Sequence, residues 1–168
     1  TGMPKGVMYK HGGFVSGMLK TGAAWGLLPI SPEELEDMGN AGFDVNTVPS
    51  LVKGLAETDN LIVSLPACPL MHGTGMWLGA LIPLSVGGTV VTIPQLGFDP
   101  ENLLKETEKH KVNNLVIVGD AFAKPIMDSL DKAKAERNPY NIESVNMMIS
   151  SGVMWSSEVK EGLLAHHE

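Results

Sequence analysis

Residues 61–94 read LIVSLPACPLMHGTGMWLGALIPLSVGGTVVTIP. Two short runs in this stretch predict buried strands, because neither of them alternates apolar with polar residues. The first run, Leu61–Leu65, stops at Pro66, and the second, the β-branched Thr89–Ile93, stops at Pro94. Proline is a natural end for a strand, because it has no N–H to donate to a neighbour.

A helix between these strands is predicted for Gly73–Val86, which is rich in small residues and is followed by Gly87-Gly88. The same alternation of strand and helix continues to the end of the chain. The further elements expected are a helix from Asp99-Pro100 to about Lys111, a strand at Leu115–Val118, a helix with Phe122, Ile126, Ser129, Leu130 and Ala133 on one face, a strand at Val145–Ile149, and a helix capped by Ser156 and ending at Leu164.

Strands that alternate with helices imply crossover connections, so the expected fold class is α/β with a mainly parallel sheet. Ligands of such sheets bind beyond the carboxyl ends of the strands. Three loops occupy such positions: Pro66–Gly75, Gly119–Asp120 and Ser150–Met154. Ile30–Pro49 has weaker periodicity and is interpreted as a surface excursion within one domain of residues 1–168. A short helix is expected near Pro32–Met38.

The composition excludes several classes of protein. The chain has 168 residues, a net charge of −7 and no basic stripe, so we expect no nucleic-acid partner. No apolar run reaches the roughly 20 residues that span a bilayer, so we expect no membrane span. Cys68 is the only cysteine, which excludes an internal disulfide and favours a reducing, cytoplasmic location. The charged fraction of 18% is low for a globular domain, as it would be if a larger protein covered part of this surface.

Thr1–Val7 is the first motif that could carry chemistry. Its glycines allow a turn with N–H groups facing an anion, and Lys5 supplies a mobile cation. A plain Gly/Pro turn with a solvated lysine explains the same residues. The motif is not a Walker A loop, which needs Gly-Lys-Ser/Thr after a four-residue gap.

Pro69–Gly75 and Ser150–Met154 are the second and third motifs, each directly after an expected strand. His72 in the second could contact a ligand or act as an acid or base, although a lone histidine is also a common structural residue. Backbone in the third could line a flat purine, and the alternative is an ordinary strand-to-helix loop.

No metal site is predicted. Gly119-Asp120 offers one carboxylate, and Asp120 is equally suited to capping the helix that follows. His166-His167 is interpreted as a solvated helix end.

In this order, the motifs resemble the adenylate-forming superfamily of acyl-CoA synthetases, luciferases and peptide-synthetase adenylation domains. Thr1–Val7 resembles the second half of the family's phosphate loop, Tyr-Thr-Ser-Gly-Thr-Thr-Gly-x-Pro-Lys-Gly. Pro69–Gly75 is similar to its Pro-Leu-x-His segment, and Ser151–Met154 to its Gly-Gly-Ala-Pro loop. Val116–Pro125, with Ser150–Trp155, is most similar to bacterial acyl-CoA synthetases of the fatty-acid type. The resemblance covers essentially the whole chain, as part of the family's large N-terminal domain.

The resemblance implies roles for particular residues. Those expected to hold the ATP phosphates are Thr1, Gly2 and Lys5. Those expected to border the acyl and adenylate site are His72, Gly73 and Thr74, with Lys5 and His72 catalytic. Those expected to line adenine are Gly152, Val153 and Met154, although Ala-Pro is the common pair where this chain has Val153-Met154.

The implied parent is an ATP-dependent acyl-CoA synthetase that uses ATP, Mg²⁺ and CoA, and the chain is expected to be an internal piece of it. A medium or long fatty acid is the expected substrate, because apolar Met76, Trp77 and Leu78 follow small residues. The piece alone is expected to be inactive, because the first half of the phosphate loop, the Gly-Tyr-Gly-x-Thr-Glu segment and the C-terminal lysine are missing. Self-association through exposed apolar faces is a further expectation. The alternatives are a peptide-synthetase adenylation domain and a non-catalytic Rossmann-like binding domain.

Overall fold

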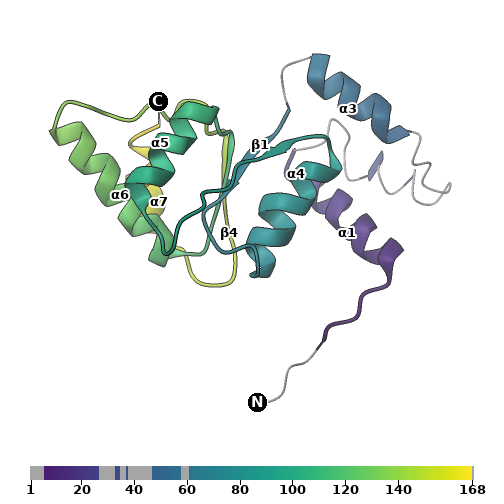
Figure 1. The fold of residues 1–168 in the computed structure, drawn as a ribbon. Coiled ribbons are helices and arrows are strands. Elements are labelled where there is room, and N and C mark those ends of the chain that lie inside the picture. Colours follow the sequence, from purple (N-terminus) through teal and green to yellow (C-terminus); the bar gives the residue numbers. More distant parts are fainter. Residues whose placement is uncertain (1–5, 27–32, 35–36, 38–46, 58–60, 168) are drawn as a thin grey trace.

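A parallel sheet lies at the centre of the chain (Figure 1). The computed structural model describes residues 6–26, 33–34, 37, 47–57 and 61–167. In that part the sheet has the order β2-β1-β3-β4 and every neighbouring pair is parallel. The strands are β1 (Val63–Pro66), β2 (Thr89–Val90), β3 (Asn114–Ile117) and β4 (Met147–Ser150). The expected α/β class with a mainly parallel sheet is therefore confirmed.

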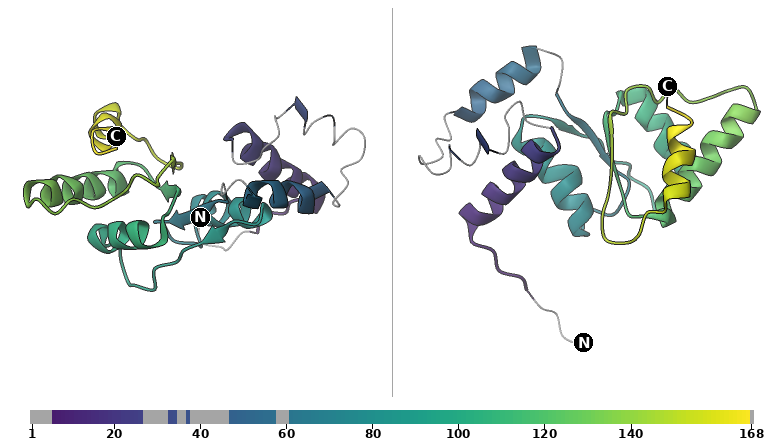
Figure 2. Two further views of the ribbon diagram at one scale, coloured as in Figure 1. Left: turned by 90° about the horizontal axis from the view of Figure 1, so that it is seen from above. Right: turned by 180° about the vertical axis from the view of Figure 1, so that it is seen from behind.

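Helices cover both faces of this sheet (Figures 1 and 2). The described helices are α1 (His11–Ala24), α3 (Thr47–Glu57), η1 (Thr74–Leu81), α4 (Ile82–Ser85), α5 (Pro100–His110), α6 (Asp120–Ala135) and α7 (Ser157–Leu164). One apolar core joins the sheet to α5, α6 and α7, with Leu65, Leu115 and Ile126 among its fully buried members. A second joins α1, α3 and α4 through Leu19, Leu55 and Ile82. Burial on both faces explains why the strand sequences do not alternate.

The start of α5 forms as its sequence predicts. Asp99 precedes the helix in an extended conformation, and its Oδ1 accepts a hydrogen bond from the N–H of Asn102 at 3.1 Å. Pro100 occupies the first helical position, where a missing N–H costs nothing. The helix ends at Lys111, whose φ of 51° is left-handed.

The second predicted strand is shorter than expected. Val91 still donates its N–H to the Ser64 carbonyl at 2.8 Å, but regular pairing stops at Val90. The next donor toward this strand would be Pro66, which has no N–H, so the Val91 carbonyl receives no bond from β1. The fourth strand is displaced from Val145–Ile149 to Met147–Ser150, because Val145 instead closes a turn onto the Ile142 carbonyl at 2.9 Å.

The helix predicted for Gly73–Val86 is present, but its first part is a π-helix. η1 spans Thr74–Leu81 and continues directly into α4, and a turn with Gly87 at φ 76° follows. π-Helices are rare and are frequently found at functional sites. This one begins two residues after His72.

Residues 8–29 carry no element in the sequence analysis, yet the structure has α1 there. The described residues Glu33, Glu34 and Asp37 are helical, in agreement with the short helix expected near Pro32–Met38. Most of Ile30–Pro49 lies outside the described residues, and α3 begins at Thr47. The surface excursion therefore stays a prediction.

Candidate functional site

Three loops meet at the carboxyl edge of the sheet. Since β1, β3 and β4 are adjacent and parallel, the loops that leave them emerge side by side. His72 and Gly152 lie close together there: a Cβ placed on Gly152 would lie 3.4 Å from Cε1 of the His72 ring. The sequence predicted that both segments lie beyond the carboxyl ends of the strands, and the structure brings His72 and Gly152 together there.

The orientation of His72 is set by its own loop. Its Nδ1 accepts a hydrogen bond from the N–H of Thr74 at 3.2 Å. A neutral imidazole that accepts at Nδ1 carries its proton on Nε2. The ring is exposed, and Nε2 lies 3.8 Å from the Cβ position of Gly152. His72 therefore presents an N–H donor at the edge of the sheet, beside the third loop.

Gly75 and Gly79 let η1 pack tightly behind this histidine. A Cβ on Gly75 would come 2.6 Å from the Pro69 carbonyl oxygen, and one on Gly79 would come 2.7 Å from Cβ of Pro66. Any larger side chain would push η1 away from the end of β1. These two glycines therefore have a packing function.

The third loop, Ser151–Met154, presents exposed backbone and side chains. Gly152 has a φ of 96°, a conformation that favours glycine. Val153 is 59% exposed and Met154 is 85% exposed. Exposed apolar side chains next to a glycine turn form a surface on which a flat aromatic ring could pack.

Asp120 does not cap the helix that it begins, contrary to one of the two readings of this residue. Gly119 precedes α6, and the Asp120 carboxylate reaches across to α7, where Oδ1 accepts the Ser156 N–H at 2.9 Å. This backbone hydrogen bond, with Lys124 nearby, lowers the pKa of Asp120. Ser156 is the N-cap residue of α7, as predicted, but its side chain makes no capping bond.

An apolar groove between α1 and η1 is a feature that the sequence analysis missed. Tyr9, Phe14 and Trp77 form an aromatic cluster with ring centroids 5.4, 5.7 and 5.8 Å apart. The groove beside them has a volume of about 480 Å³, and glycines of α1 at positions 13 and 17 form part of its wall. Glycines four positions apart on a helix share a face and allow close approach, a signal that was available in the sequence.

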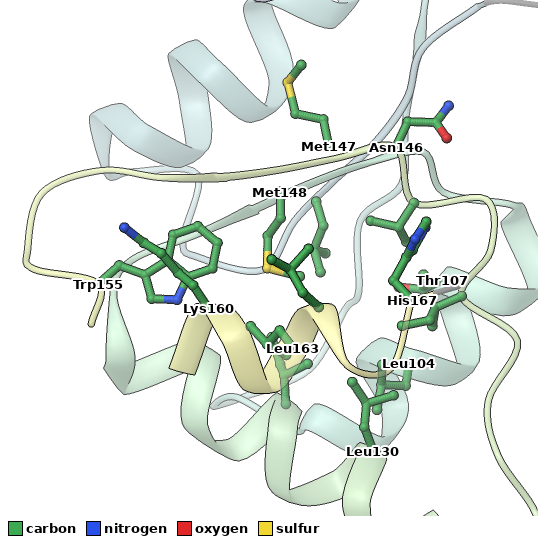
Figure 3. A pocket seen from close by; sticks show the side chains of 15 residues that line it. Leu104, Thr107, Leu130, Asn146, Met147, Met148, Trp155, Lys160, Leu163 and His167 are labelled. Carbon is green, nitrogen blue, oxygen red and sulfur yellow. The ribbon is translucent and has the colours of Figure 1, made fainter. Parts of the chain in front are cut away.

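A second hollow lies on the opposite face of the sheet (Figure 3). It has a volume of about 320 Å³ and a mainly apolar lining from α5, α6, α7 and β4. Lys160 lies over the Trp155 ring at 5.4 Å from its centroid.

His166 is not solvated as predicted: its side chain is only 9% exposed and Nε2 lies 2.9 Å from Oδ1 of Asp131.

The predicted phosphate loop lies at the start of the chain. Thr1, Gly2 and Lys5 lie outside the described residues. Within the described ranges, no three His, Cys, Asp or Glu side chains gather closely enough to hold a metal ion. In the same ranges, no helix has the length and hydropathy to cross a membrane.

Comparison with known proteins gives one family. The sequence model of the family described as AMP-binding enzyme matches residues 1–167. A medium/long-chain-fatty-acid–CoA/3-oxocholest-4-en-26-oate–CoA ligase of Mycolicibacterium smegmatis is 30% identical over 167 residues, which are 98% of this chain and 26% of that protein. A 3-oxocholest-4-en-26-oate–CoA ligase of Rhodococcus rhodochrous is 30% identical over 165 residues, with the same coverage. The medium-chain acyl-CoA ligase Mig of Mycobacterium avium is 25% identical over 166 residues. The chain spans about a quarter of the length of these relatives, at 26%.

Proposed function

Since the chain belongs to the AMP-binding enzyme family, we propose that it forms part of an ATP-dependent acyl-CoA ligase, with the reacting groups at the carboxyl edge of its sheet. The observation that carries this proposal is the proximity of His72 and Gly152, whose segments resemble the acyl-site and adenine-site motifs of the adenylate-forming superfamily. Two of the relatives bear the names of CoA ligases, which supports the same reaction.

The proposed reaction has two steps. A carboxylate oxygen of the acid attacks the α-phosphorus of ATP, an acyl–AMP anhydride forms, and pyrophosphate leaves. The thiol of CoA then attacks the acyl carbonyl carbon, loses its proton, and displaces AMP. A protein accelerates such steps mainly by positioning the reactants and stabilising the charge that develops.

His72 is the described residue best placed to act on the acyl group. Its Nε2–H points to the loop that would hold the nucleotide, so it can donate to an oxygen of the carboxylate or of the acyl phosphate. Gly73 and Thr74 follow it: Gly73 packs beside the Trp77 ring, and the N–H of the buried Thr74 holds the His72 ring through Nδ1. Lys5, with the backbone of Thr1 and Gly2, would bind the phosphates by the resemblance of Thr1–Val7 to a phosphate loop.

Gly152, Val153 and Met154 would form the adenine surface. Backbone at Gly152 can approach a ring closely, and the exposed side chains of Val153 and Met154 can cover its face. The pair Val153-Met154 in place of Ala-Pro changes the side chains at this surface but keeps the glycine.

Mg²⁺ is part of this proposal only as a partner of the ATP phosphates. The described residues do not fit a magnesium site, because they hold no acidic cluster and Asp120 is already bonded to Ser156 and paired with Lys124. We therefore assign no residue of this chain to the metal.

The proposed substrate is a medium- or long-chain carboxylic acid. Apolar Met76, Trp77 and Leu78 lie on the π-helix that follows His72, and the groove between η1 and α1 is lined mainly by apolar side chains. The names of two relatives extend the class to a steroid carboxylate, 3-oxocholest-4-en-26-oate. We place the enzyme in the cytoplasm, since its buried Cys68 is a free thiol.

The test is acid-dependent ATP–pyrophosphate exchange by the full-length protein that carries this chain. Exchange with octanoate or palmitate above acetate and amino acids supports the proposal, and preference for amino acids favours a peptide-synthetase domain. Absence of both exchange and adenine-nucleotide binding favours a non-catalytic binding domain. Lys5→Ala should slow exchange by about 10²–10³ with little change in acid affinity.

The groove between α1 and η1, which we propose holds the acyl chain and call the acyl groove, has its own test. Trp77→Ala should raise the KM for palmitate several-fold more than the KM for butyrate, because a longer chain contacts more of the groove. Leu84→Ala removes an exposed side chain of α4 that does not line the groove and serves as the control. Equal effects of Trp77→Ala on both acids would place the acyl chain elsewhere.

The isolated 168-residue chain is proposed to be inactive and prone to self-association through exposed apolar residues such as Met8, Met71 and Leu96. Acid-dependent exchange clearly above a no-enzyme blank would overturn the first part. A monomeric mass in light scattering at high protein concentration would overturn the second.

A further inference from the structure

Hydrogen bonds fix the loop Ser150–Ser156 to Gly119 and Asp120, the two residues that link the neighbouring strand β3 to α6. The Gly119 N–H donates to Oγ of Ser150 at 2.8 Å, at the start of the loop. The Asp120 N–H donates to the Met154 carbonyl at 3.4 Å, and the Ser156 N–H donates to Oδ1 of Asp120 at 2.9 Å. Two consecutive residues therefore contact the loop at its beginning, near its exposed tip and at its end.

The backbone at Gly119 leaves no room for a side chain. Gly119 has a φ of 55°, and a Cβ there would come 2.6 Å from the Met154 carbonyl oxygen and closer still to Val153. The loop thus packs directly on the bare backbone of Gly119. Its position is set by the end of β3, which is the strand next to β4 in the sheet.

The Asp120 carboxylate carries the bond at the far end of the loop. It lies in the first turn of α6 and accepts from the N-cap residue of α7, two helices that pack side by side (Figure 1). A carboxylate near helix N-termini is favoured by the helix dipole. The Asp120 carboxylate accepts the N–H of the N-cap residue itself, the donor that the side chain of the third helical residue satisfies in a capping box.

We propose that Asp120 is a positioning residue for the nucleotide, acting through the loop Ser151–Met154. This inference rests on the proposed function, in which that loop holds adenine. With the anchor removed, the loop keeps its sequence but loses its fixed distance from His72. ATP binding should weaken, whereas the acyl groove between α1 and η1, on the other face of the sheet, should be unaffected.

The experiment compares Asp120→Ala with Asp120→Asn in the full-length enzyme, since the amide oxygen of Asn can still accept the Ser156 N–H. Asp120→Ala should raise the KM for ATP about tenfold, equivalent to about 1.4 kcal/mol, and leave the KM for the fatty acid within about twofold. Asp120→Asn should restore the KM for ATP to within about threefold of the wild type. Asp128→Ala is the control, because it removes an exposed aspartate from the same helix.

Three outcomes would overturn the inference: equal changes in both KM values, an Asp120→Ala enzyme that behaves like Asp128→Ala, or no recovery in Asp120→Asn. If Asp120→Ala does not fold, Ser150→Ala removes the acceptor at the other end of the loop. The same selective rise in the KM for ATP is then expected, and its absence counts against the inference. A wild-type enzyme without pyrophosphate exchange would refute the proposed function, whereas an active wild type with unaffected variants would refute only the positioning role.

Discussion

Gly75→Ala should destabilise the chain even though it replaces a helical glycine. A Cβ at this position would come 2.6 Å from the Pro69 carbonyl oxygen and 3.0 Å from that of Cys68. Both neighbours are backbone atoms, so they cannot move aside by changing rotamer. Overpacking of this kind costs about 1–3 kcal/mol, and the better helix propensity of alanine returns up to about 1 kcal/mol. We expect a net loss of about 1–2 kcal/mol.

Gly17→Ala is the matched control, because a Cβ there meets nothing within 4 Å. It should stabilise α1 by about 0.5–1 kcal/mol, so the two variants should differ by about 2 kcal/mol in opposite directions. For a chain of this size that difference corresponds to about 4–8 °C in Tm. Urea unfolding of the 168-residue chain, followed by tryptophan fluorescence, measures both. A Gly75→Ala chain as stable as Gly17→Ala would refute the packing argument for η1.

Three further predictions concern buried and charged groups. Ser64→Ala should cost about 1–3 kcal/mol in urea unfolding, because it removes the acceptor 3.0 Å from Nδ2 of the fully buried Asn114; a loss below about 0.5 kcal/mol would contradict this. Burial raises the pKa of the Cys68 thiol, so iodoacetamide at neutral pH should label it only when urea unfolds the chain, and fast labelling of the native chain would be the opposite result. The Ser156 N–H lowers the pKa of Asp120, so its contribution to stability is complete above the unfolded value of about 3.9 and is lost as the pH falls through the folded value. The Tm difference between wild type and Asp120→Ala should accordingly shrink in acid, and a constant difference from pH 7 to pH 3 would argue against the bond.

Local signals in the sequence were sufficient to predict much of the sheet and α5. Leu61–Leu65 and Leu115–Val118 are apolar runs bounded by turn residues, and Asp99-Pro100 combines a capping side chain with a helix-starting proline. Each of these depends on residues within a few positions of one another. The parallel direction of the strands then follows from the alternation of strands and helices, without knowledge of any long-range contact.

The parts that escaped prediction depend on distant residues. His11–Ala24 contains Gly12, Gly13 and Gly17, which disfavour an isolated helix, and α1 is stabilised instead by packing against α4 and η1. The hydrogen bond between Asp120 and Ser156 joins residues 36 positions apart. It could be found only once β3 and β4 were known to be neighbours, and the sequence read alone suggested a local cap for each of these residues.

The order β2-β1-β3-β4 also has a consequence during synthesis on the ribosome. His72 and Gly152 are 80 positions apart, and β4 is the last of the four described strands to emerge. At about 5–20 residues per second, the interval between them is about 4–16 s. β3 is complete at Ile117 and β4 only at Ser150, 33 positions later, so β3 lacks its partner on one side for about 2–7 s of that interval. An unpaired apolar edge is a surface that chaperones bind and other nascent chains can join. The yield of soluble protein should therefore depend on chaperone supply and on the translation speed between the codons of β3 and β4. Changes in the codons that follow β4 should affect this yield less.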